Sequence, residues 1–132
     1  MYKFYNANSH GNFVNDCVVR AISLVECKRW ADTHKELSNL AQQQGILLDD
    51  VEFVERYLDD KYQRIKHKSK FIGELCEEFP DKRLLVTMNG HITAIINGIL
   101  YDTFDCRDRI IWDVWEVPSC EDYCVNNTQL EE

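Results

Sequence analysis

Apolar residues recur at helical spacing through the first half of the chain, and this period predicts four helices. Asp16 is a preferred N-cap, so the first helix is expected directly after it, and Glu52 completes a capping box for the third. Gly45 closes the second helix, and Pro80 stops the fourth. The predicted helices begin at Cys17, run over about 30–44, follow Asp49, and begin at Ser69.

After Pro80 the pattern changes to short apolar runs, which are typical of strands. Asn-Gly pairs at 89–90 and 97–98 separate the first three runs, and Asn-Gly is the strongest short-range hairpin signal because both turn residues take positive φ. The predicted strands are Arg83–Met88, His91–Ile96, Ile99–Phe104 and Ile110–Val117. Helices followed by a meander predict an α+β fold, with N-terminal helices packed on a C-terminal antiparallel β-sheet.

The two ends of the chain differ from this pattern. Residues 1–15 are rich in Asn, Ser and Gly and are expected to form a loop, and residues 118–132 are expected to form a flexible acidic tail. A length of 132 residues is typical of one domain, so a single domain over 1–132 is predicted.

Composition narrows the class of function. A net charge of −8 disfavours binding to nucleic acid or to an anionic membrane, which both require a basic surface. No secretory signal and no apolar stretch of about 20 residues is present, which favours a cytoplasmic protein with reduced cysteines and no disulfides. The six cysteines lack a paired C-x-x-C spacing, so neither a bound metal nor another cofactor is expected.

Three residues stand out as candidates for chemistry. A thiol at a helix N-terminus, as expected for Cys17, meets unpaired backbone N–H groups and the positive end of the helix dipole, which favour the thiolate. Asp102 lies in an apolar strand, where a buried carboxylate is costly unless it is paired. His91 opens the preceding strand, and an ordinary structural role at the sheet rim is the simpler interpretation of that position taken alone.

The hairpin register brings two of these residues together. Two-residue turns pair Met88 with His91 and Ile96 with Ile99, which makes His91 and Asp102 diagonal neighbours about 7–8 Å apart at the backbone. Thr93 then lies opposite Asp102. The same face carries apolar residues that we expect to pack on the helix beginning at Cys17: Leu84, Val86, Ile95 and Leu100.

These segments resemble a known family. The run Asn-Asp-Cys-Val-Val-Arg-Ala-Ile-Ser, followed downstream by Asn-Gly-His-Ile-Thr-Ala-Ile-Ile-Asn-Gly-Ile-Leu-Tyr-Asp-Thr, resembles small papain-like cysteine peptidases over about residues 12–117. It looks most like the bacteriocin-processing type and the short versions encoded by bacteriophages. The resemblance implies a papain-like fold with Cys17 as nucleophile, His91 as general base and Asp102 as orienting residue.

The same resemblance bears on the oxyanion site. Papain-like enzymes usually place a Gln shortly before the catalytic Cys, but no Gln precedes Cys17. Asn12 and Asn15 are the available amides, with the backbone N–H of Cys17 as the second donor. A missing donor can cost about 10²–10³ in rate.

The leading hypothesis is a hydrolase that cleaves a peptide or isopeptide bond in a peptide or protein substrate. The main alternative is a weak or inactive papain-like binding protein, encoded by a phage, that blocks a factor in the host cytoplasm. A zinc site made by Cys17, His91 and Asp102 is a third hypothesis, which the absence of a fourth ligand disfavours. Neither the cleavage specificity nor the oligomeric state has a signal in the sequence.

Overall fold

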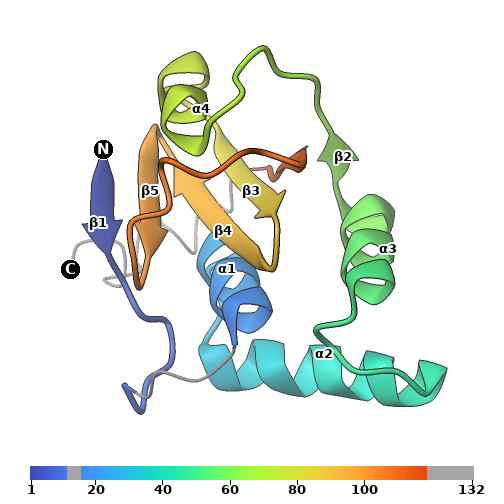
Figure 1. The fold of residues 1–132 in the computed structure, drawn as a ribbon. Helices are drawn as coiled ribbons and strands as arrows, with labels where there is room; N and C mark the ends of the chain where they lie inside the picture. Colours follow the sequence, from blue (N-terminus) through green and yellow to red (C-terminus); the bar gives the residue numbers. More distant parts are fainter. Residues whose placement is uncertain (12–15, 119–132) are drawn as a thin grey trace.

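The computed structural model describes residues 1–11 and 16–118, which form four helices and a six-stranded mixed sheet (Figure 1). The helices are α1 (Cys17–Glu26), α2 (Trp30–Gln44), α3 (Val51–Lys61) and α4 (Ile72–Glu78). The strands are β1 (Tyr2–Phe4), β2 (Gln63–Arg64), β3 (Arg83–Met88), β4 (His91–Ile96), β5 (Ile99–Asp102) and β6 (Asp113–Glu116). The predicted α+β class is therefore confirmed.

The helix boundaries follow the sequence signals closely. The predicted span of α2 is confirmed, and Gly45 ends that helix in the left-handed conformation. The capping residue of α3 is Asp50 rather than Asp49, and its side chain accepts hydrogen bonds from the backbone N–H groups of Glu52 and Phe53. The last helix, α4, begins three residues later than the predicted Ser69.

Both predicted hairpin turns are present, and they set the register of the central sheet. Met88 pairs with His91 across the first turn, and Ile96 pairs with Ile99 across the second. Asn97 and Gly98 take positive φ, at 52° and 75°. In the first turn only Gly90 does so, which corrects the expectation of two positive φ values at each turn.

Two short strands extend the sheet beyond the prediction. Strand β1 lies within the segment that was expected to be a loop. It pairs in parallel with β5, so the sheet is mixed rather than purely antiparallel. Strand β2 pairs with β6 at the opposite edge, which gives the order β1-β5-β4-β3-β6-β2. Both strands are too short to show a period of two, and their partners lie far away in sequence.

Helices cover both faces of the sheet, and this corrects one predicted contact. The face that bears Leu84, Val86, Ile95 and Leu100 packs against α4, not against α1. Helix α1 packs on the opposite face, in a core shared with α2 and α3. Figure 1 shows α4 and α2 at opposite ends of the molecule, with the sheet between them. The N-terminal helices therefore form one layer and α4 another.

Other expectations concern the chain ends and the cysteines. The predicted tail over 118–132 lies outside the described residues apart from Pro118. Of the four described cysteines, Cys17, Cys76 and Cys106 are free, whereas Cys27 is disulfide-bonded, so the expectation of no disulfides is wrong. Among the described residues, no helix has both the length and the apolar character needed to cross a membrane.

Candidate active site

Cys17 is the first residue of α1 and is half-buried beside β4. Burial alone would raise the pKa of its thiol. A hydrogen bond with the His91 side chain, a backbone hydrogen bond from Ile92 and the positive charges of His91 and Arg20 outweigh burial, so the pKa of Cys17 lies below its ordinary value. The local surroundings therefore favour the thiolate.

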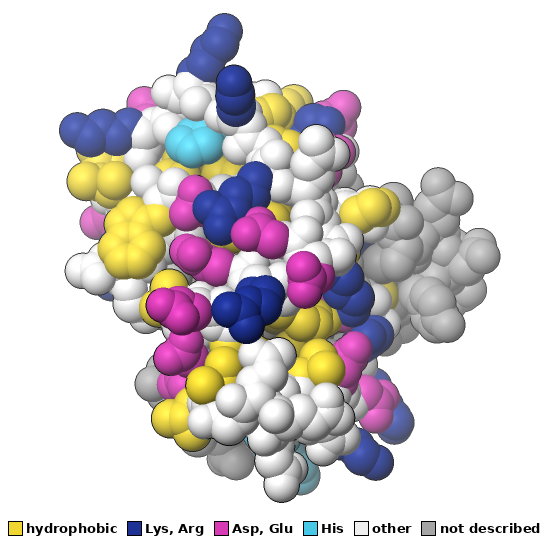
Figure 2. All heavy atoms as spheres, turned by 90° about the vertical axis from the view of Figure 1, so that its right-hand side faces the viewer, with side chains coloured by type: hydrophobic (Ala, Val, Ile, Leu, Met, Phe, Trp, Pro, Cys, Tyr) yellow, Lys and Arg dark blue, Asp and Glu magenta, His cyan; other side chains and the backbone are white. Residues whose placement is uncertain are grey.

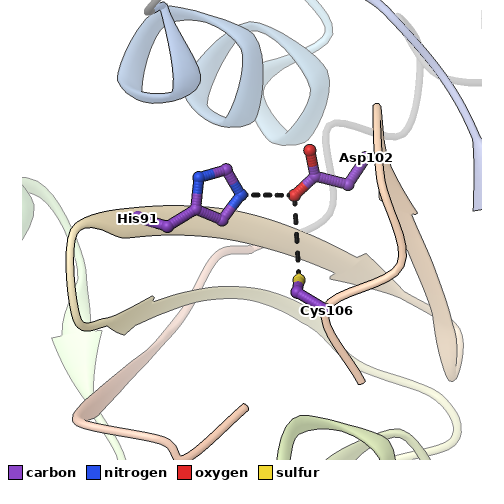
Figure 3. A group of neighbouring side chains, drawn as sticks. All are labelled: His91, Asp102 and Cys106. Carbon is purple, nitrogen blue, oxygen red and sulfur yellow. Dashed lines mark hydrogen bonds and ion pairs between the residues drawn. The ribbon is translucent and has the colours of Figure 1, made fainter. Parts of the chain in front are cut away.

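His91 and Asp102 form a close pair at one end of the central sheet. The Nε2 atom of His91 lies 2.6 Å from Oδ2 of Asp102, and the two side chains are only 8% and 4% exposed (Figure 3). Burial would lower the pKa of His91, but hydrogen bonds with Asp102 and Cys17 raise it to about 9. The imidazole is therefore protonated at neutral pH.

The ring orientation follows from these contacts. The Asp102 carboxylate is ionised, because its hydrogen bonds with His91, Thr93 and Thr103 outweigh the effect of burial and lower its pKa. An ionised carboxylate only accepts hydrogen bonds, so Nε2 of His91 carries the donated proton. The second ring nitrogen is left for the hydrogen bond with Cys17. The structure thus brings Cys17, His91 and Asp102 together in that order.

Several further groups stabilise the buried carboxylate. Oδ2 of Asp102 accepts a hydrogen bond from the hydroxyl of Thr93 at 2.7 Å, and Oδ1 accepts one from the backbone N–H of Thr103, also at 2.7 Å. A guanidinium nitrogen of Arg20 lies 3.6 Å from Oδ1. A buried carboxylate with this many donors stays ionised and keeps a fixed orientation.

Arg20 connects this carboxylate to the start of α1. Its guanidinium also donates to Asp16, the residue directly before the thiol. Asp16 does not cap the helix with its side chain, although its position suggested that role; instead it accepts a hydrogen bond from Nε1 of Trp30 at 2.8 Å. The beginning of α1 is therefore held to both α2 and the Asp102 carboxylate.

Cys106 was not singled out by the sequence and raises the question of a metal. His91, Asp102 and Cys106 place three possible ligand atoms within 4.8 Å of one another (Figure 3). Burial and the neighbouring Asp102 charge raise the pKa of Cys106 to about 12, so its thiol stays protonated and donates to Oδ2 of Asp102 at 3.9 Å. The positive charge of Arg20 beside Asp102 also opposes a cation. In this structure the three side chains are joined by hydrogen bonds to the Asp102 carboxylate.

The candidate oxyanion donors divide into two groups. Asn12 and Asn15 lie outside the described residues. The backbone N–H of Cys17 is at the N-terminus of α1, where amides have no carbonyl partner within the helix. That position is suited to hold negative charge that develops next to the thiol.

A groove of about 350 Å³ lies directly beside the thiol and the imidazole. Its lining comes from the start of α1, the first part of α3, the β3–β4 turn and Trp112. Both Cys17 and His91 belong to the lining, so a molecule bound in the groove lies against the candidate reactive groups. The sequence offered no signal for this groove, because its walls are distant from one another along the chain.

The comparisons with known proteins add no name to this site. No family model, curated protein or solved structure matches the chain significantly. Three groups in hydrogen-bonded order define the chemistry of the site: a thiol of lowered pKa, a buried imidazolium and an ionised carboxylate. These are the groups of an activated sulfur nucleophile with an acid–base partner.

Proposed function

We propose that the protein is a cysteine-dependent hydrolase that cleaves a peptide or isopeptide bond. The observation that carries this proposal is the hydrogen-bonded chain from Cys17 through His91 to Asp102. The thiol has a lowered pKa and the imidazole a raised one, so the resting pair is a thiolate and an imidazolium. This pair supplies a nucleophile and an acid at neutral pH without a further cofactor.

The reaction follows from these protonation states. The Cys17 thiolate attacks the carbonyl carbon, and the resulting oxyanion accepts hydrogen bonds from amides at the start of α1. The C–N bond breaks as the His91 imidazolium gives its proton to the leaving amine, which leaves a thioester. Neutral His91 then takes a proton from water, the hydroxide attacks the thioester, and a carboxylic acid and the thiolate are released. Asp102 keeps the imidazole oriented and stabilises its protonated form.

The fold arrangement supports a papain-like scaffold as part of the same proposal. The nucleophile begins a helix that packs on a sheet, and the base and the orienting carboxylate come from neighbouring strands of that sheet. The resemblance of the Cys17 and His91 segments to small papain-like peptidases agrees with this arrangement. An inactive binding protein could retain the same scaffold, so a chemical test has to separate the two.

Alkylation by iodoacetamide, followed by intact-mass analysis and peptide mapping, makes that test. Cys17 should react rapidly at pH 6, well below the ordinary thiol pKa of about 8.5, and at least about 100-fold faster than Cys76, whose pKa is raised by burial. Cys17→Ala should abolish the fast phase. His91→Ala should slow it at least about tenfold, because the thiolate loses its imidazolium partner.

The outcome separates the two hypotheses. Labelling of Cys17 no faster than Cys76 at pH 6 would contradict the hydrolase and favour the binding protein. A peptide-aldehyde probe gives a second readout, because its reversible thiohemiacetal with a thiol is stabilised where the peptide also binds the adjacent surface. The wild-type protein should bind the aldehyde reversibly, whereas Cys17→Ala should not.

A further inference from the structure

The groove beside Cys17 combines exposed apolar side chains with acidic ones. Val51 is 60% exposed and Trp112 is 50% exposed, and both line the groove beside the candidate nucleophile. The apolar part of the lining also includes Val18, Val54, Met88 and Ile92. Exposed apolar walls of this kind lose contact with water when a ligand covers them, which favours binding.

Two carboxylates add negative charge to the groove beside the Cys17–His91 pair. Asp49 and Glu55 both belong to the lining, which contains no lysine or arginine among the residues that the structure describes. Glu55 is partly neutralised, because Arg64 lies 3.7 Å from it. Figure 2 shows basic side chains among acidic ones over the middle of the face formed by α3 and β2. Asp49 is exposed and, within the described ranges, takes part in no ion pair.

The geometry points to a lysine or arginine side chain as the occupant. We propose that this groove binds such a side chain of the substrate, close to the scissile bond. The aliphatic stem would lie on the apolar walls, and the cationic head would meet Asp49 and Glu55 and the indole face of Trp112. An acidic side chain would be repelled by the same carboxylates, and a neutral one would form no ion pair with Asp49.

This inference rests on the proposed hydrolase, because it assigns the substrate class of the same site. Digestion of a proteome-derived peptide library should show cleavage sites enriched in Lys or Arg within two residues of the broken bond, and Cys17→Ser should remove them. Peptides that differ only by Lys or norleucine at the enriched position then give the preference. An exposed ion pair and a cation–π contact together predict a five- to twentyfold higher kcat/KM for Lys, on the order of 1–2 kcal/mol.

Variants assign that preference to the groove. Asp49→Asn should reduce the Lys preference to about twofold or less, while leaving the rate of Cys17 alkylation unchanged. Asp60→Asn removes the same charge from the far part of α3, outside the groove, and should keep the full preference. A norleucine peptide cleaved as well as its Lys counterpart, or an Asp49→Asn variant with the full preference, would overturn the proposal.

Binding provides a readout that does not need hydrolysis. Fluorescence anisotropy with Cys17→Ala and fluorescein-labelled peptides should show tighter binding of the Lys peptide than of the norleucine peptide by a similar factor. Equal binding would refute the groove assignment even if the enzyme is active. Failure of the proposed function has a different signature, because Cys17 is then slow to alkylate and no cleavage depends on it.

Discussion

Replacement of Asp102 by Asn tests the electrostatic coupling of the candidate triad. Asn keeps the size and an acceptor oxygen but removes the negative charge that His91 contacts at 2.6 Å. The pKa of His91 is raised from 6.5 to about 9, a difference that corresponds to about 3 kcal/mol in favour of the imidazolium. The hydrogen bond with Cys17 supplies part of this free energy, so Asp102→Asn should remove some of it and not all.

The expected result has two parts. The pKa of His91 should fall by about one or more pH units toward 6.5, since about 1.4 kcal/mol is enough for one unit. The Cys17 thiolate should also be less favoured, because less imidazolium faces it at any given pH. Alkylation of Cys17 at pH 6 should therefore slow by about tenfold or more.

Proton NMR of the imidazole C–H signals measures the first part directly. The chain has four histidines, and His91→Gln identifies the signal that belongs to His91. Asp105→Asn is the matched control, because Asp105 is an exposed carboxylate that binds Arg107 rather than the imidazole. If His91 titrates near 6.5 in the wild type, or if Asp102→Asn changes neither the His91 pKa nor the alkylation rate, the triad argument is refuted.

Two further predictions concern stability. In Cys17→Ala, folded His91 retains a proton above pH 6.5 that the unfolded chain lacks, so urea denaturation should show stability falling as pH rises from 6.5 to the His91 pKa of this variant, which is below the wild-type value of about 9 because the Cys17 contribution is lost. The wild type should show a smaller slope because its thiolate offsets that proton, and equal slopes would contradict the ion pair. Gly98→Ala should cost about 2–4 kcal/mol, since its φ is 75° and a Cβ would lie 2.9 Å from the Cys76 carbonyl oxygen, whereas Gly90→Ala, with open space around it, should cost about 1 kcal/mol.

The register of the candidate site was predictable because it depends on local chemistry. Two Asn-Gly turns fix which residues of β3, β4 and β5 face one another, and strand geometry then fixes the neighbours of each side chain. The predicted register places His91 beside Asp102 and Thr93 opposite Asp102. Both His91 and Thr93 form hydrogen bonds with Asp102, in agreement with this register. The start of α1 at Cys17 was also predicted, but the predicted cap is absent, because the Asp16 side chain accepts hydrogen bonds from Arg20 and Trp30 instead.

Long-range features were not predictable in the same way. Strand β1 pairs with β5 about a hundred residues away, and nothing in three residues indicates that partner. Cys106 lies in the connection after β5, and only its position in space makes it a donor to Asp102. The groove beside Cys17 joins α1, α3, the β3–β4 turn and Trp112, which no sequence spacing relates.

The sequence predicted the wrong sheet face for α1, but His91 still contacts both Asp102 and Cys17. His91 is the first residue of β4 and Asp102 the last of β5, whereas the pairing of these strands ends at Ala94 and Tyr101. Each residue still pairs with the strand on its other side, His91 with Met88 of β3 and Asp102 with Phe4 of β1. Asp102 nevertheless contacts groups from both layers. Arg20 reaches it from α1 and Cys106 from the core shared with α4. A carboxylate at the end of a strand can thus be buried in the sheet and still orient an imidazole toward a helix on the other face.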